Sequence, residues 1–393
     1  MGSIHVSERV RRIKPSPSTS AADRANQLRR EGRSIVNLVV GEPDFDTPAH
    51  IIEAAVKALR DGQTHYSPAP GIPELREAAS AFFERTRGVD YPPDRIVVVP
   101  GAKPIMFFTI LALCDEGDEV IYPDPGFPMY ESITAMAGAT PVPIRLREVN
   151  EFRVDPDELA SLVTDRTRLL ILNSPHNPCG SALTRSDLEA IAEAIRGRDL
   201  YVLSDEVYWA IRYEGAHESI AELDGLAERT ILLDGCSKSF AMTGWRLGFA
   251  ALPEPLVEPF TRLVINAVSC TATFTQHAAV AALTGPWEPV EEMIREFRTR
   301  RDVIVEGLNR IEGITCLEPA GAFYVFPNVS TLGGSGRDLV TYLLEEAGVA
   351  GLWGTAFGPA GEGYLRFSYA NSVENIRAAL EAIEAALPGY RGG

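Results

Sequence analysis

The chain has few of the residues that build metal sites and disulfide frameworks. Its 393 residues include five cysteines and six histidines, and the cysteines lie far apart with no Cys-x-x-Cys pair. An odd number of widely spaced cysteines is typical of reduced thiols in a cytoplasmic protein and excludes a disulfide scaffold or a zinc framework. No two histidines have metal-binding spacing, so no metal site is predicted.

Positive charge and long apolar runs are also scarce. Lys and Arg number 37 against 54 Asp and Glu, a net charge of −17. This balance argues against nucleic acid or an anionic membrane as a partner, because both are polyanions. The most apolar window, residues 96–113, is interrupted by Gly101, Lys103 and Pro104 and is too broken to span a bilayer. The first twenty residues lack the apolar core of a signal peptide. We therefore expect a soluble, cytoplasmic protein.

Short apolar runs alternate with amphipathic stretches through the middle of the chain. The runs are residues 95–99, 119–122, 168–172, 200–203 and 230–233. Strands that are apolar on both faces are typical of a parallel sheet covered by helices. Between them, residues 186–196 have helical periodicity, with Thr184 or Ser186 as the expected cap. The pattern predicts an α/β fold with a mostly parallel sheet.

The pattern changes after Pro286, which suggests a division of the chain. Residues 288–310 predict one long exposed helix, followed by strands at 322–326 and 364–368 and a closing helix at 373–387. We therefore expect a large domain over residues 47–284 and a smaller α+β domain over residues 285–393. Residues 1–46 begin with a basic arm rich in Pro and Ser and would contribute to the small domain.

Three polar residues stand just past predicted strand ends: Asn177, Asp205 and Lys238. Open α/β sheets bind ligands outside the carboxyl ends of their strands. Each residue alone is compatible with a turn, a helix cap or a solvated lysine. Together they offer an amine for a Schiff base and a carboxylate for a pyridinium nitrogen, which pyridoxal phosphate requires. The chain has no P-loop, His-Glu-x-x-His or complete Gly-x-Ser-x-Gly motif that would favour a rival chemistry.

Seven strings, in order along the chain, identify a known family. They are Gly41-Glu-Pro-Asp-Phe-Asp-Thr-Pro48, Gly71-Ile-Pro-Glu-Leu-Arg76, Asn173-Ser-Pro-His-Asn177-Pro-Cys-Gly180, Ser204-Asp205-Glu-Val-Tyr208, Ser237-Lys238-Ser-Phe-Ala-Met-Thr-Gly-Trp-Arg246-Leu-Gly248, Gly321-Ala-Phe-Tyr324 and Leu365-Arg366-Phe-Ser368. They resemble the class I/II (fold type I) aminotransferases that use pyridoxal 5'-phosphate, and in particular the bacterial, thermophile-type aspartate aminotransferases. The resemblance runs from about Lys14 to the C-terminal helix. It implies a fold type I transferase whose large domain binds the cofactor.

The resemblance also implies the residues that hold the cofactor. Lys238 would be the catalytic residue, holding the cofactor as an internal aldimine and then moving the α-proton. Asp205 would pair with the pyridinium nitrogen, while Asn177 and Tyr208 would bind the phenolic oxygen and lower the imine pKa. Further contacts to the phosphate and the ring would come from Gly101, Ala102, Lys103, Arg246, Phe127 and Tyr66. Tyr66 would cross from the partner subunit, which implies a homodimer.

The same resemblance implies a substrate site. Arg366 would bind the α-carboxylate in bidentate fashion, with Gly41 and Asn177 beside it. Residues 265–277 contain no arginine to read a side-chain carboxylate, but Lys103 matches the lysine that has this role in the thermophile branch. Ser16 and Ser18 fall near polar N-terminal contacts of that branch. We expect an L-amino acid, aspartate or another acidic one, to react with a 2-oxo acid such as 2-oxoglutarate in a ping-pong mechanism.

Alternative interpretations remain open at this stage. Phe127 and Tyr208 also suit a plain apolar core, Gly41 suits a turn and Lys103 suits a solvated surface. Trp353, where the family usually has proline, is expected to reshape the pocket. A lyase, racemase or cyclase of the same fold would begin with the same carbanion. A cofactor-binding regulator would need an added DNA-binding domain, for which the first 46 residues leave no room.

Overall fold

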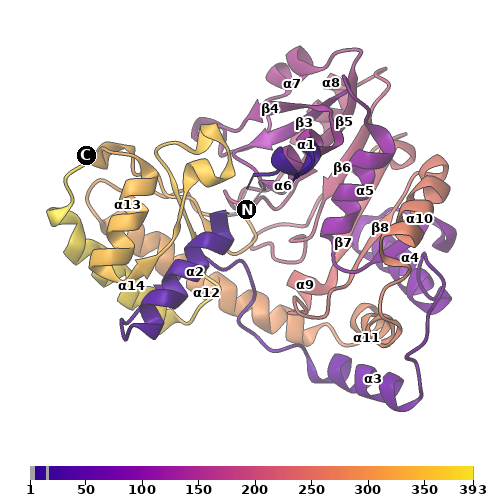
Figure 1. The fold of residues 1–393 in the computed structure, drawn as a ribbon, viewed down its shortest axis with the longest axis horizontal. Helices are drawn as coiled ribbons and strands as arrows, with labels where there is room; N and C mark the ends of the chain where they lie inside the picture. The colour runs from indigo at the N-terminus through magenta and orange to yellow at the C-terminus, as the bar shows by residue number, and fades with distance from the viewer. Residues whose placement is uncertain (1–4, 15–16, 393) are drawn as a thin grey trace.

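The computed structural model describes residues 5–14 and 17–392, so Ser16 lies outside the described residues. Its centre is a seven-stranded sheet in the order β2-β8-β7-β6-β5-β3-β4 (Figure 1). The strands are β2 (Ile96–Val99), β3 (Glu119–Asp124), β4 (Thr140–Arg145), β5 (Thr167–Asn173), β6 (Tyr201–Asp205), β7 (Thr230–Gly235) and β8 (Gly248–Ala251). Strand β8 runs opposite to the other six strands and is antiparallel to both of its neighbours, β2 and β7. The expected mostly parallel α/β sheet is confirmed, with β4 and β8 as additional strands.

Helices cover both faces of this sheet because its central strands are apolar on both sides. In β5, Leu170 and Leu172 pack in one core cluster, whereas Leu169 and Ile171 pack in another. This alternation follows from successive side chains of a strand pointing to opposite faces. The covering helices are α4 (Pro73–Arg87), α5 (Lys103–Leu113), α6 (Met129–Ala137), α7 (Pro156–Leu162), α8 (Arg185–Ala194) and α10 (Glu254–Val268). Helix α11 (Thr273–Thr284) packs against α4, and α3 (Ala49–Arg60) packs against α11. Thr184 caps α8 in a capping box with Asp187, as one of the two predicted caps.

A second, three-stranded sheet lies beside the first, with the order β11-β12-β9. Its strands are β11 (Leu352–Trp353), β12 (Leu365–Ser368) and β9 (Tyr324–Val325), all antiparallel to their neighbours. Helices α13 (Gly336–Tyr342) and α14 (Val373–Ala386) lie in the same part of the molecule (Figure 1).

The helix predicted at residues 288–310 forms as α12 (Glu288–Arg310), but the expectation that it is exposed is wrong. Its apolar residues recur every three to four positions and bury one face of the helix. Arg300 and Arg301 are buried on the same helix, where Asp44 and Glu318 provide carboxylate partners at 2.6 and 3.0 Å. The many charged residues of this segment led to the expectation of an exposed helix, although one face of α12 packs in the core.

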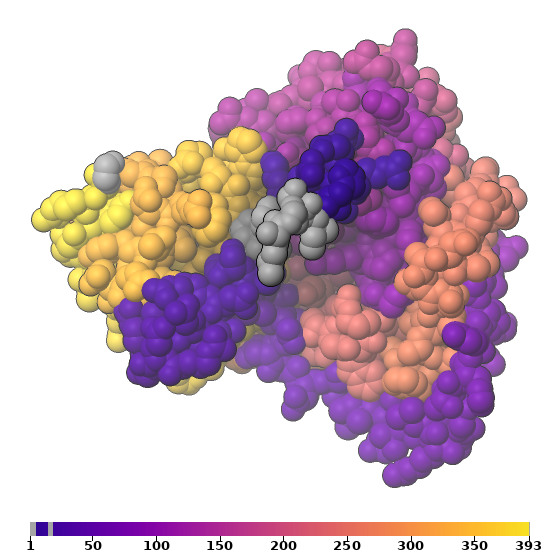
Figure 2. All heavy atoms as spheres, viewed as in Figure 1, coloured from indigo at the N-terminus to yellow at the C-terminus, as the bar shows by residue number. Residues whose placement is uncertain are grey.

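The described N-terminal helices lie against elements beside both the seven-stranded and the three-stranded sheet (Figure 2). Near α1 (Glu8–Arg11), Lys14 pairs with Glu131 of α6 at 2.7 Å. Further along, α2 (Pro17–Arg30) leads to β1 (Val36–Asn37), which pairs in parallel with β10 (Val349–Ala350). No helix within residues 5–14 and 17–392 combines the length and apolar character needed to cross a membrane.

Candidate active site

The predicted polar residues meet at the carboxyl ends of three adjacent parallel strands. Asn173, the last residue of β5, is paired with Asp205, the last residue of β6. The chain then leads from β5 to Asn177, from β6 to Tyr208, and from β7 into the short helix α9 (Cys236–Ser239), which carries Lys238. Because parallel strands end at one edge, residues far apart in sequence come together there.

Most of the predicted site residues line one cavity of about 420 Å³, here called the inner cavity. Its predicted members are Gly41, Ala102, Lys103, Phe127, Asn177, Asp205, Tyr208, Lys238, Arg246 and Arg366. Gly101 lies just behind it, where an added Cβ would be 2.2 Å from the Arg246 guanidinium. Tyr66 is 89% exposed and is not among the residues that line the cavity of its own chain.

Lys238 is the amine of the inner cavity. Its Nζ donates a hydrogen bond to the Gly41 carbonyl oxygen at 2.6 Å. Burial lowers the pKa of Lys238 to about 8, aided by the positive charge of Arg366 and opposed in part by Glu42. A lysine with this pKa has a substantial neutral fraction near physiological pH, which is the form that attacks a carbonyl carbon.

Asp205 is a buried carboxylate with a hydroxyl partner. Tyr130 donates to Asp205 Oδ2 at 2.6 Å, and the Val207 amide donates to Oδ1 at 3.3 Å. Burial raises the pKa of Asp205 to about 6, and its hydrogen bonds compensate only in part. Within the described residues Asp205 forms no ion pair, so a cation placed beside it would complete its environment.

A cluster of buried charges lies behind these residues. Arg87, at the end of α4, donates from Nε to Glu206 at 3.1 Å and from Nη2 to Asp234, and all three side chains are at most 2% exposed. Glu206 also accepts from Ser219 at 2.6 Å and contacts His217 at 2.8 Å. Burial alone would raise the pKa of Glu206, but His217 and Arg87 outweigh it and lower that pKa. Through Arg87, the cluster connects Glu206, the residue after Asp205, with Asp234 of β7, the strand that leads to Lys238.

One end of the inner cavity is positively charged. Gly101 and Ala102 precede α5, and the first amide groups of a helix have no acceptor within that helix. Arg246 lies beside Gly101, and its Nη1 donates to the Thr243 carbonyl oxygen at 2.8 Å. Lys103 begins α5, and desolvation together with the charge of Arg246 lowers its pKa. This end of the cavity has the donors and the charge that suit an anion such as phosphate.

Arg366 is a buried guanidinium with an incomplete set of partners. It lies on β12, is 4% exposed, and donates to Asn177 Oδ1 at 3.2 Å and to the Val39 carbonyl oxygen. Its Nε has no hydrogen-bond partner among the described residues, and burial lowers its pKa. A buried guanidinium without a carboxylate favours an incoming anionic ligand.

A second cavity of about 580 Å³, here called the outer cavity, adjoins the first. Lys103, Phe127 and Arg366 line both cavities. The other walls of the outer cavity include Trp353 and Lys14. The Lys103 ammonium lies 5.5 Å from the centre of the Phe127 ring. Lys103, Phe127 and Arg366 therefore stand at the boundary of the two cavities.

Two tyrosines of the inner cavity were not predicted as site residues. Tyr130 stands three positions after Phe127, meets its ring edge-on at 5.7 Å and binds Asp205. Tyr324 belongs to the Gly-Ala-Phe-Tyr string, and its hydroxyl lies 2.8 Å from that of Tyr208. Phe127 lies just before α6 and Tyr130 in its first turn, where the Tyr130 amide donates to the Phe127 carbonyl oxygen, and this closeness in sequence is the one signal that could have found Tyr130.

Comparison with known proteins decides the family. The family described as aminotransferase class I and II matches residues 33–383. The chain belongs to this family. The aminotransferase is 43% identical over 386 residues to the aromatic-amino-acid aminotransferase 2 of Thermococcus litoralis, covering 97% of this chain and 98% of that one. It is 40% identical to the aspartate aminotransferase of Geobacillus stearothermophilus, with 97% and 98% covered.

Solved structures give the same result for the fold. The aspartate aminotransferase of Thermus thermophilus with maleate superposes with a TM-score of 0.94 at 38% identity, covering 98% of this aminotransferase and all of that chain. The fold is therefore that of a fold type I aminotransferase, and the enzyme depends on pyridoxal 5'-phosphate. These matches do not favour the lyase, racemase or cyclase alternatives.

The residues present fit that cofactor. Asp205 is a buried carboxylate that has no cationic partner within residues 5–14 and 17–392, as a protonated pyridine nitrogen requires. Lys238 offers an amine with a lowered pKa in the same cavity. The amides before α5 and the Arg246 guanidinium offer donors for a phosphate at the opposite end.

Proposed function

We propose that this aminotransferase takes acidic L-amino acids, with aspartate as the donor and 2-oxoglutarate as the acceptor. The observation that carries the proposal is the pair of cations shared by the two cavities. Among the described residues, neither Arg366 nor Lys103 has a carboxylate within ion-pair distance, and both face the space between the cavities. A dicarboxylic substrate would place one carboxylate on Arg366 and the other near Lys103.

The chain's own residues would each do one part of the work. When bound, pyridoxal phosphate supplies an aldehyde carbon that reacts with amines and a ring that accepts electrons from the substrate's α-carbon. Lys238 would bind that aldehyde carbon. Once a substrate amine has displaced it, its neutral amine would accept the α-proton, becoming an ammonium, and would then release that proton to the second carbon. Asp205, held by Tyr130, would keep the pyridine nitrogen protonated. Asn177 and Tyr208 would bind the phenolic oxygen, and Phe127 would pack on the ring.

The remaining predicted residues would orient the two ligands. Arg366 would fix the α-carboxylate, with the backbone of Gly41 and the amide of Asn177 beside it. The amides of Gly101 and Ala102 and the side chains of Lys103 and Arg246 would hold the phosphate. Because Lys103 lines both cavities, it is placed to face phosphate and substrate alike.

We propose in addition that the enzyme is a cytoplasmic homodimer in which Tyr66 reaches the partner's cofactor. The 89% exposure of this large aromatic side chain supports the assignment, because a tyrosine completing its own site would be covered. The proposed domains are residues 47–284 and 285–393, with residues 1–46 as the arm. The seven-stranded sheet falls within the first and the three-stranded sheet within the second. Sedimentation equilibrium on the loaded enzyme tests the dimer.

The decisive experiment follows the absorption spectrum of the loaded enzyme after single amino acids are added without an oxo acid. We expect L-aspartate and L-glutamate to convert the visible band of the cofactor to that of its pyridoxamine form. A Lys238→Ala protein should convert at least about 10³-fold more slowly. Conversion by apolar or aromatic amino acids alone would refute the acidic substrate class. A product formed without the pyridoxamine form would refute transamination.

A further inference from the structure

Tyr324 is the point at which three predicted site residues meet. It begins β9 in the three-stranded sheet and is 1% exposed. Its hydroxyl lies 2.8 Å from that of Tyr208, and the Arg366 guanidinium lies 4.5 Å from the centre of its ring. A Cβ added to Gly41 would lie 2.2 Å from the Tyr324 hydroxyl, so the Gly41 backbone packs directly against it.

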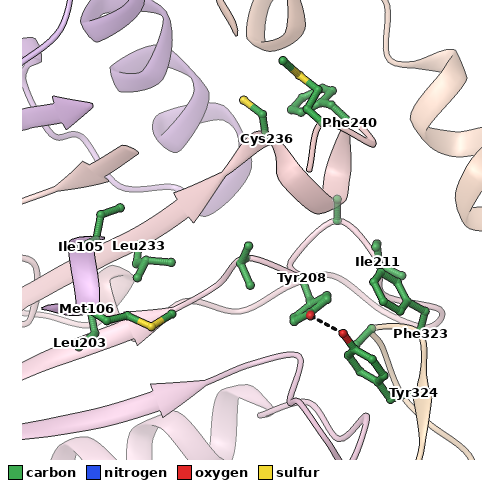
Figure 3. Close-up of a cluster of buried hydrophobic side chains, with 14 of the residues drawn as sticks. Ile105, Met106, Leu203, Tyr208, Ile211, Leu233, Cys236, Phe240, Phe323 and Tyr324 are labelled. Carbon is green, nitrogen blue, oxygen red and sulfur yellow. Dashed lines mark hydrogen bonds between the residues drawn. The ribbon is translucent and has the colours of Figure 1, made fainter. Parts of the chain in front are cut away.

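The two tyrosines approach from different sheets (Figure 3). Tyr208 follows β6 of the seven-stranded sheet, and Tyr324 belongs to β9, with the hydroxyl groups joined and the rings edge-on at 81°. In the three-stranded sheet, β9 pairs with β12, the strand that carries Arg366. The Tyr208–Tyr324 contact therefore connects β12, which carries Arg366, through β9 with Tyr208 of the predicted cofactor site.

The direction of this hydrogen bond follows from counting protons. Each tyrosine hydroxyl has a single proton to donate. If Tyr208 donates its proton to the phenolic oxygen of the cofactor, it has none left for Tyr324. The 2.8 Å contact is then a hydrogen bond only if Tyr324 is the donor. Among the described residues, Tyr208 is the one hydrogen-bond partner of the Tyr324 hydroxyl.

We propose that Tyr324 is a positioning residue of the active site, whose hydroxyl donates to Tyr208 and directs the Tyr208 proton to the cofactor, and whose ring supports Arg366. The inference rests on the proposed function, because it requires Tyr208 to bind the phenolic oxygen. A hydrogen bond accepted by Tyr208 polarises its own O–H and strengthens the bond that it donates. A stronger bond stabilises the phenolic anion and so lowers the pKa of the Schiff base between Lys238 and the cofactor.

The test is a spectrophotometric pH titration of the loaded enzyme's visible band in four proteins: the wild type, Tyr208→Phe, Tyr324→Phe and the double variant. We expect Tyr208→Phe to raise the pKa of the Schiff base by about one unit, the value of one lost hydrogen bond to a charged group. Tyr324→Phe should raise it by about 0.3 unit, since it only weakens that bond. The double variant should match Tyr208→Phe alone.

Each outcome separates the inference from the function on which it rests. If Tyr208→Phe moves the pKa but Tyr324→Phe does not, the inference fails and the role of Tyr208 stands. If the two shifts add in the double variant, Tyr324 does not act through Tyr208, and the inference also fails. If Tyr208→Phe itself leaves the pKa unchanged, the proposed role of Tyr208 fails, and the inference with it.

One further variant, Tyr369→Phe, distinguishes positioning from simple packing. Tyr369 is another fully buried tyrosine whose hydroxyl binds a tyrosine, Tyr213, at 3.0 Å, but it lines neither cavity. Tyr369→Phe should leave the Schiff-base pKa unchanged, and a shift as large as that of Tyr324→Phe would overturn the inference.

The supporting role of the ring has its own readout. Tyr324→Phe keeps the ring beneath Arg366, so the KM for the amino acid should stay within twofold of the wild-type value. Tyr324→Leu removes the ring and should raise that KM about fivefold or more, because a desolvated cation–π contact is lost. An unchanged KM in a folded Tyr324→Leu protein would overturn the support of Arg366. Cofactor-free unfolding temperatures establish that each variant is folded.

Discussion

The two sides of the active site are built on different principles. On the cofactor side, Asp205 and Lys238 stand at strand ends, and Tyr130, Gly41 and the backbone satisfy their polar groups. On the substrate side, Lys103 and Arg366 border two adjoining cavities and form no ion pair within the described part of the chain. Hydrogen bonds within the chain hold the first pair in place and leave only a cation to be added beside Asp205, whereas the described residues offer the second pair no carboxylate.

The difference indicates which properties of the enzyme depend on its buried hydrogen-bond networks and which depend on single side chains. A group held by several neighbours has a set position and a set pKa, so the chemistry is preorganised. A cation beside an open cavity selects its ligand by charge and fit. The cofactor chemistry should therefore depend on buried networks, and the substrate preference on single side chains.

The largest effect is expected from breaking the buried network behind the cofactor side. Arg87→Met leaves Glu206 and Asp234 buried without a guanidinium, which should lower the free energy of unfolding by about 3–5 kcal/mol. Urea unfolding of the cofactor-free protein measures the loss. Arg262→Met, which breaks the exposed pair with Glu258, is the matched control and should cost less than about 0.5 kcal/mol. Equal losses in the two variants would contradict a preorganised cofactor side.

The second prediction concerns the pH dependence of cofactor attachment. The neutral amine of Lys238 is the reactive form, and its fraction increases as the pH rises through its pKa of about 8. The rate at which pyridoxal phosphate develops its visible band with cofactor-free enzyme should increase about tenfold per pH unit from pH 6 and level off above pH 8. Stopped-flow absorbance measures this rate. A rate that still rises steeply above pH 9 would mean that the cavity does not lower the pKa of Lys238.

The third prediction addresses the substrate side at Arg366. Arg366→Lys keeps the charge but loses the planar, bidentate donor pair, so kcat/KM should fall about 10- to 100-fold for every amino acid tested. Steady-state kinetics with aspartate and with alanine measure the effect. Because the α-carboxylate is common to all amino acids, the two losses should be alike. A loss confined to aspartate would assign Arg366 to the side-chain carboxylate instead.

The smallest and most selective effect is expected at Lys103. Lys103→Met should lower kcat/KM about tenfold for aspartate and leave alanine within about twofold, since only aspartate has a second carboxylate. The affinity for pyridoxal phosphate, measured in the same variant, separates a role at the phosphate from a role at the substrate. Equal losses for both amino acids together with weaker cofactor binding would place Lys103 at the phosphate alone.

The predictability of the fold and of the site differs from element to element. Five of the seven strands of the large sheet, all but β4 and β8, were predicted because nearly continuous apolar runs such as 168–172 are typical of strands buried on both faces. Strand β4 was missed because Pro141 and Pro143 interrupt its pattern at the sheet edge. The helix α12 was placed correctly, but its charged residues hid the buried face that Arg300 and Arg301 share with apolar neighbours.

The amino-acid sequence alone indicates the family and the cofactor chemistry, and it predicts most strands of the large sheet in their order. Seven ordered sequence motifs carry the resemblance to the family, and Asn177, Asp205 and Lys238 each lie at or within a few residues of a strand end. Three contacts became visible only in the folded chain: Tyr130 with Asp205, Arg87 with two buried carboxylates, and Tyr324 with Tyr208. These contacts join residues 75, 119 and 116 positions apart, for Tyr130–Asp205, Arg87–Glu206 and Tyr208–Tyr324 respectively. Hydrogen bonds act over about 3 Å in space, and no pattern of spacing along the chain encodes which distant side chains will come that close.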